Sequence, residues 1–137
     1  MTYDIVSERK GPEIKISGPA DVFQAVRRYA KKEQEHFLVI TLDSANKIIR
    51  VHIVFIGLLN RSLVHPREVF LRAIKDNSAG IIVSHNHPSG SLEPSNEDRE
   101  VTRRLSEAGM LIGIPVLDHV LISKMGFSSF KTLGLLN

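Results

Sequence analysis

Residues 81–98 read IIVSHNHPSGSLEPSNED, and this stretch carries most of what the sequence says about the fold. It opens on the apolar run 81–83, a short strand of the kind that is buried on both faces between helices. Proline and glycine in the loop 88–94 are typical of turns. A helix is expected over residues 95–108, with Gly109 as its C-terminal stop. The stretch therefore predicts a buried strand, a turn and a helix in succession.

The same stretch holds the donor atoms of a catalytic zinc site, spaced His-x-His-x7-Ser-x2-Asp: His85, His87, Ser95 and Asp98. Side chains at i and i+2 of an extended backbone point the same way, so both imidazoles can face one point at the end of the sheet. Open α/β sheets place ligand sites at that end. Asp98, in the first turn of the helix, could complete a His-His-Asp set with water in the fourth position. Ser95 is placed to stabilise the anion formed when such water attacks a carbonyl.

Each part of this pattern also has an ordinary structural interpretation. Ser-x-x-Asp is a helix capping box, and Ser95 and Asp98 stand where one is expected. Capping and metal binding are compatible, because Asp98 could do both. An isolated His-x-His is commonly satisfied by surface or loop hydrogen bonds, and only the combined set favours a metal.

The other four histidines favour ordinary packing or hydrogen bonding. His36 begins a strand beside Glu35. His52 is expected to face solvent in the middle of a hairpin, and His65 is expected to cap a helix. His119 follows Asp118 within a strand, where an indirect contact with the metal site is left open.

Strands and helices alternate through the rest of the chain, with one early hairpin. The expected elements are a short strand at 14–16, a helix from Pro19 through Lys32, hairpin strands at 37–42 and 48–56, a helix from Pro66, a strand at 116–122 and a short last strand within 127–136. The helix from Pro66 should bury one apolar face, formed by Val69, Phe70, Ala73 and Ile74. This order predicts an α/β fold: a mixed sheet flanked by helices in a three-layer sandwich.

Composition predicts that residues 1–137 form a single domain, with residues 1–12 a flexible or edge-pairing arm. The absence of cysteine excludes disulfides, thiolate ligands and cysteine nucleophiles. No apolar run approaches the ~20 residues of a membrane span, and residues 1–10 lack the core of a signal peptide, so we expect a cytoplasmic protein that does not contact a membrane. The net charge is +3, and the basic residues around 27–32 read first as the solvated face of a helix.

The motifs resemble the RadC-like family of the JAB/MPN (JAMM) metalloprotease superfamily. They are Glu-His-Phe at 35–37, His-Asn-His-Pro-Ser-Gly at 85–90, Pro-Ser at 94–95, Asp98 and Leu-Asp-His at 117–119, and the resemblance runs from about residue 14 to 136. It implies the three-layer MPN/JAB sandwich, which is similar to the cytidine deaminase fold. A deaminase is disfavoured, because its Cys-x-x-Cys zinc pair is impossible in this chain.

The resemblance also implies roles for individual residues. His85, His87 and Asp98 would bind Zn²⁺, Glu35 would be the general acid/base, and Ser95 would stabilise the oxyanion. Only the Glu-His-Phe context selects Glu35. From spacing alone, three other glutamates were equally open: Glu33, Glu68 and Glu93.

Two departures from the family pattern concern the substrate. The N-terminal helix-hairpin-helix segment usual in full RadC-like proteins is missing, which predicts either a short standalone member or an excised domain. Asn86 stands between the histidines where isopeptidase relatives usually have Ser or Thr, and the insertions that grip ubiquitin have no room here.

The predicted function is that of a JAMM-type zinc metallopeptidase or isopeptidase acting on a protein or peptide. One alternative is a DNA-repair-associated accessory module whose zinc is mainly structural, although the mild charge disfavours strong DNA binding. Another is a metal-dependent nuclease, disfavoured because phosphoryl transfer commonly uses paired metals. A homodimer is left open.

Overall fold

The computed structural model describes residues 7–9, 13–58 and 64–136. In this part of the chain six strands form one sheet in the order β1-β3-β2-β4-β5-β6. The strands are β1 (Ser7–Arg9), β2 (His36–Leu42), β3 (Ile48–Ile56), β4 (Gly80–Asn86), β5 (Val116–Ser123) and β6 (Gly126–Ser129). The β4–β5 pair is parallel and every other pair is antiparallel, so the sheet is mixed, as predicted.

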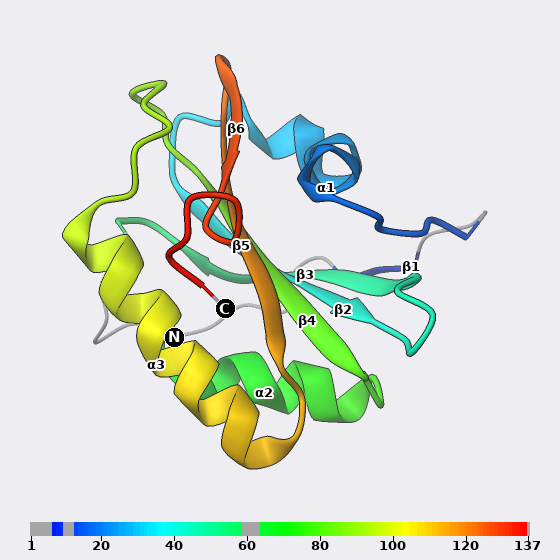
Figure 1. Cartoon of the computed structure of the whole chain (residues 1–137). Coiled ribbons are helices and arrows are strands. Elements are labelled where there is room, and N and C mark those ends of the chain that lie inside the picture. Colours follow the sequence, from blue (N-terminus) through cyan, green and yellow to red (C-terminus); the bar gives the residue numbers. More distant parts are fainter. Residues whose placement is uncertain (1–6, 10–12, 59–63, 137) are drawn as a thin grey trace.

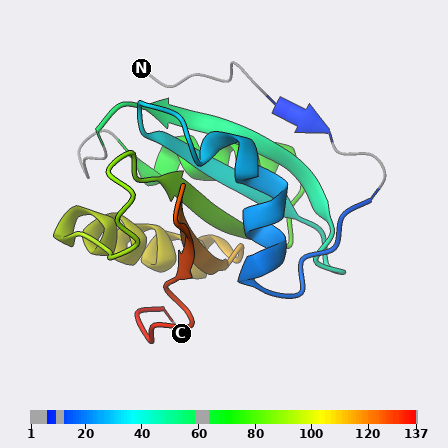
Figure 2. The ribbon, with the colours of Figure 1, turned by 90° about the horizontal axis from the view of Figure 1, so that it is seen from above.

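Helices cover both faces of the sheet, which gives the predicted three-layer α/β sandwich. They are α1 (Pro19–Val26), continued by a 3-10 turn η1 (Arg27–Tyr29), α2 (Pro66–Lys75) and α3 (Asn96–Ile112). Figure 1 shows α1 on one side of the sheet and α2 with α3 on the other, and Figure 2 shows the same layers from above. The architecture is consistent with an MPN/JAB fold. None of the described helices is both long and apolar enough to cross a membrane.

The alternation of side chains along the central strands divides the core in two. In β4, Val83 packs into the apolar cluster under α2 and α3, whereas Ile82 packs into the cluster under α1. Successive residues of a strand point to opposite faces. His85 therefore lies on the face covered by α2 and α3, and Asn86 lies on the face covered by α1. This alternation therefore directs the two polar side chains at the end of β4 to opposite faces of the sheet.

The central elements match the sequence predictions closely. The hairpin strands 37–42 and 48–56 appear as β2 and β3. The His65 side chain caps α2 by accepting a hydrogen bond from the Arg67 backbone N–H at 3.0 Å. The strand predicted at 81–83 is longer in the structure: β4 continues to Asn86 and includes His85.

Two predictions near the N-terminus are wrong. Residues 14–16 form only a single bridge, Lys15 with Lys47, because they cross the turn between β2 and β3 instead of running along a strand. The helix from Pro19 ends at Val26 and tightens into η1 instead of continuing to Lys32. Within the predicted arm, Ser7–Arg9 forms the edge strand β1 and pairs with β3. Residues 1–6 and 10–12 lie outside the described residues.

Two burial predictions are also wrong. Ile74 is 58% exposed, since it lies one residue past Ala73 and has turned off the apolar face of α2. His52 is only 3% exposed and its Nε2 lies 2.7 Å from an Asp76 carboxylate oxygen. Asp76 follows α2 and also accepts hydrogen bonds from Thr41 and Arg50. His52 is buried because it contacts this carboxylate.

The predicted end of α3 is wrong for a steric reason. The helix continues past Gly109 to Ile112, and the left-handed cap is Gly113, with φ of 85°. The backbone N–H groups of Gly113 and Ile114 both donate to the Gly109 carbonyl. A Cβ on Gly109 would lie 2.6 Å from the Ile114 carbonyl oxygen and 3.2 Å from Cζ of Phe70. Gly109 therefore permits a close approach of the returning chain.

We expect Gly109→Ala to lower the free energy of unfolding by about 1–3 kcal/mol. The clash involves backbone, which cannot turn aside, so it outweighs the ~1 kcal/mol that alanine gains in a helix. Urea unfolding measures the change, with Met110→Ala at a 79% exposed neighbouring position as the control. Wild-type stability in Gly109→Ala would show that the backbone at Ile114 can move away from the added methyl group without loss of stability.

Candidate metal centre

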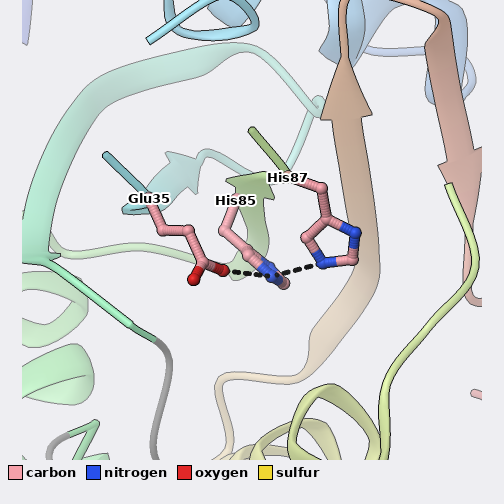
Figure 3. A group of neighbouring side chains, drawn as sticks. All are labelled: Glu35, His85 and His87. Carbon is pink, nitrogen blue, oxygen red and sulfur yellow. Dashed lines mark hydrogen bonds and ion pairs between the residues drawn. The ribbon is translucent and has the colours of Figure 1, made fainter. Parts of the chain in front are cut away.

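The residues of the predicted site come from three parts of the chain and meet at the end of β4. Figure 3 shows three of them, Glu35, His85 and His87, side by side. His85 is in β4 and His87 follows it, while Glu35 directly precedes β2 and Asp98 lies in the first turn of α3. The neighbouring strands β2 and β4 bring Glu35 close, because Phe37 pairs with His85 at the end of their ladder. The His85 and Asp98 side chains are each only 1% exposed.

The donor atoms are spaced for one cation. The Nε2 atoms of His85 and His87 lie 3.0 Å apart, and the Asp98 oxygens Oδ1 and Oδ2 lie 2.9 and 3.2 Å from them respectively. A tetrahedral ion with bonds of about 2.0–2.1 Å separates its ligands by about 3.3 Å. Glu35 Oε1 is more distant, at 3.7 Å from His85 Nε2, but it too lies within 4.8 Å of both histidine nitrogens. Glu35, His85 and His87 thus form a group that could hold a metal ion.

A backbone contact orients the His87 ring. Its Nδ1 lies 2.8 Å from the Ser91 carbonyl oxygen, which can only accept a hydrogen bond. Nδ1 therefore carries hydrogen, and in the neutral ring Nε2 presents a lone pair to His85 and Asp98.

A buried chain of hydrogen bonds assigns the same tautomer to His85. The Thr102 hydroxyl donates to the Asp98 carbonyl oxygen at 2.7 Å, so its oxygen accepts from His119 Nδ1. His119 Nε2 is then an acceptor, 3.0 Å from His85 Nδ1, which must donate. Burial, with the nearby His85, lowers the pKa of His119 and favours the neutral ring that this chain requires. His85 Nε2 is therefore also a lone pair facing the site.

Two lone pairs and a carboxylate about 3 Å apart need a positive charge between them, from a proton or a metal cation. Burial alone would raise the pKa of Asp98, but where the positive charge is a proton on His85 or His87, its hydrogen bond to the carboxylate holds the pKa of Asp98 well below its usual range. The hydrogen bond with Asp98 in turn raises the pKa of His87. Imidazole nitrogens with a carboxylate are donors that suit zinc and similar transition metals. The donor set fits a divalent cation.

Ser95 caps α3. Its Oγ accepts from the Asp98 backbone N–H at 3.0 Å, and the Asp98 carboxylate accepts from the Ser95 N–H at 2.7 Å. The capping interpretation of Ser-x-x-Asp is therefore confirmed. Asp98 caps the helix and faces the histidines at the same time.

We expect Ser95→Ala to lower the free energy of unfolding by ~1 kcal/mol, the usual cost of losing an N-cap side chain. Metal affinity should be retained, because the Asp98 carboxylate keeps its bond from the residue 95 backbone N–H. Urea unfolding and a zinc titration check the two parts. Ser89→Ala, on the exposed loop, is the matched control. An unchanged stability in Ser95→Ala would contradict the capping contribution.

A cleft of about 630 Å³ opens beside the donor atoms. Its lining residues are Glu33, Glu35, Leu58, His87, Pro88, Ser89, Ser91, Glu93, Ser95, Glu97 and Asp98. Four of the five predicted site residues thus line the cleft, and the fifth, His85, lies directly behind them. A substrate can reach the donor atoms from this side.

Sequence reasoning missed Thr102, whose hydroxyl links His119 to the Asp98 backbone. A signal was present: Thr102 is four residues beyond Asp98, and such residues share one face of a helix. His119, for which an indirect contact was left open, hydrogen-bonds His85 directly and stacks on Phe130 with ring centres 4.4 Å apart.

Comparison with known proteins shows the family of the chain. Residues 16–135 match the family model described as RadC-like JAB domain. The chain is similar to proteins named UPF0758 protein from Rubrobacter xylanophilus (51% identity, 88% of this chain and 53% of the relative) and Methanospirillum hungatei (50% identity, 90% and 56%). It spans about half the length of these relatives. On this match, which covers nearly all of the sequence, the chain belongs to the RadC-like JAB domain family.

Proposed function

We propose that the protein is a zinc-dependent hydrolase of peptide or isopeptide bonds. His85, His87 and Asp98 would hold the zinc ion and Glu35 would act as the general acid/base. One observation carries the proposal: two Nε2 lone pairs and a carboxylate converge within about 3 Å at the wall of a cleft, with a second carboxylate close by. The JAB/MPN superfamily, which includes metalloproteases, is in keeping with this chemistry.

The distances favour Glu35 as base over Glu35 as ligand. Its carboxylate is 3.7 Å from His85 Nε2, against 2.9 Å for Asp98. The Glu35 side chain is also 16% exposed, on the cleft side, whereas Asp98 is enclosed. A base must reach both the attacking water and the leaving group, and this position meets that requirement.

Each residue then has a distinct task. When bound, zinc lowers the pKa of a water ligand towards about 7 and polarises the scissile carbonyl. Glu35 takes the proton of the attacking water and later delivers it to the leaving amine. The Ser95 Oγ accepts the capping hydrogen bond from the Asp98 N–H through a lone pair. The hydroxyl hydrogen of Ser95 is therefore available to donate to the oxyanion. The cleft holds the substrate carbonyl beside these groups.

Metal analysis followed by a cleavage screen tests the proposal. Purified protein should contain about one zinc per chain, and a His85→Ala variant should contain none. The zinc-loaded protein is then incubated with a library of peptides and of lysine-linked isopeptides. Cleavage that stops with a chelator and returns with zinc supports the proposal. Zinc-loaded protein that cleaves nothing in either library would argue against it.

Four exposed basic side chains favour the alternative of a DNA-associated module: Arg27, Arg28, Lys31 and Lys32. A salt titration of DNA binding decides between the two functions. Phosphate contacts make affinity fall steeply as salt rises. Flat, negligible affinity at all ionic strengths would remove the DNA-associated alternative, and a steep slope would support it.

A further inference from the structure

Asn86, between the two histidines, faces away from the metal centre and contacts the segment that carries Glu35. Its side chain is fully buried. The Oδ1 atom accepts from the His36 backbone N–H at 2.6 Å. The Nδ2 atom donates to the carbonyl oxygens of Lys32 and Gln34, at 3.2 and 3.0 Å. One amide group thus binds three backbone atoms on both sides of Glu35.

These contacts begin where the sheet ladder ends. The last paired residues of β2 and β4 are Phe37 and His85, so the backbone pairing of the two strands ends there. Beyond this point the Asn86 side chain links β4 to the 32–36 segment in place of backbone hydrogen bonds. The Gly57 N–H also donates a hydrogen bond to the Glu35 carbonyl oxygen, at 2.8 Å. A primary amide supplies one acceptor and two donors, which is what this geometry uses. A serine or threonine hydroxyl offers a single donor and a shorter reach.

The Glu35 carboxylate depends on this backbone for its position. Its Oε1 lies 3.7 Å from His85 Nε2, and it belongs to the group that could hold a metal ion because it lies beside the two histidines. Because β4 alternates its side chains, residues 85 and 86 serve opposite faces. His85 reaches the proposed metal, and Asn86 reaches the strand that brings the base to it.

We propose that Asn86 is a positioning residue that holds the 32–36 segment so that the Glu35 carboxylate stands over the metal centre. This rests on the function proposed above. Asn86 acts only through Glu35, so its loss should lower the rate of the chemical step and leave metal binding intact. A displacement of about 1 Å at a catalytic group can cost roughly 100-fold in rate.

The test uses Asn86→Ala and the isosteric Asn86→Asp, which keeps an acceptor for His36 but replaces both donors with oxygen lone pairs. Ser84→Ala is the matched control, since Ser84 is buried on the same face of β4 and bonds Val120 instead of the 32–36 segment. Hydrogen exchange at the His36 amide should be at least about tenfold faster in Asn86→Ala, which removes its acceptor, and unchanged in Ser84→Ala. Asn86→Asp keeps that acceptor and tests the loss of the two donors through activity. Zinc affinity should be unchanged in all three.

Activity supplies the second measurement. In the two Asn86 variants kcat should fall roughly 100-fold with KM unchanged. In a Glu35→Gln background, Asn86→Ala should add no further loss, because the residue it positions has already been disabled. Additive losses in the double variant, or a full kcat in the single variants, would overturn the positioning role.

The exchange measurement separates this inference from the proposed function. If the wild-type protein hydrolyses nothing, the proposed function fails, and the His36 amide still decides whether Asn86 holds the segment. Unchanged His36 exchange in Asn86→Ala would overturn the inference even in a fully active enzyme.

Discussion

Asp98→Asn is expected to abolish stoichiometric zinc binding and leave the fold in place. The substitution keeps the shape of the side chain and an oxygen that can accept from the Ser95 N–H, so the cap of α3 survives. It removes the negative charge that faces His85 and His87 at 2.9 and 3.2 Å. Losing a group that merely supports a ligand costs 10–100-fold in metal affinity, so losing a charged ligand should cost more than about 100-fold. Zinc content after dialysis and a competition titration measure the loss.

Glu97→Gln is the matched control for Asp98→Asn. It removes one negative charge from the next position on the cleft rim, outside the donor set. Zinc affinity should be unchanged in that variant. Wild-type affinity in Asp98→Asn would assign the ion instead to the group formed by Glu35, His85 and His87.

Glu35→Gln is expected to retain zinc and lose turnover. Glutamine keeps the length and polarity of the side chain but cannot take a proton from water, so kcat should fall by about 10²–10⁴-fold. The three proposed ligands are untouched and the fold should be unaffected, since the Glu35 carboxylate is partly exposed. Steady-state kinetics on a cleaved peptide, with zinc analysis of the same sample, check both parts.

Glu33→Gln provides the comparison for Glu35→Gln. Glu33 is exposed, lies two residues away and lines the same cleft. Its variant should keep most of the activity. Hydrolysis at the wild-type rate in Glu35→Gln would remove Glu35 from the mechanism, and loss of zinc from that variant would make it a ligand.

Local chemistry made much of the fold predictable. The β2–β3 hairpin and the start of α2 follow from β-branched runs, a turn between them and a proline at the first turn of a helix. The errors come where a distant contact outweighs a local pattern. Gly109 looked like a helix end, yet its missing side chain makes room for the Ile114 carbonyl. His52 was predicted to face solvent, but it is buried in contact with the Asp76 carboxylate.

The sequence by itself determined the strand, turn and helix of residues 81–98, and with them the shared direction of His85 and His87. These depend on backbone geometry within a few residues, which the residue types dictate. Only the tertiary structure decided that Glu35 lies 3.7 Å from His85, that His119 and Thr102 set the His85 tautomer, and that the Asn86 amide hydrogen-bonds the 32–36 segment. Those placements depend on strand register and on packing between segments 17 to 54 residues apart, which no local preference encodes.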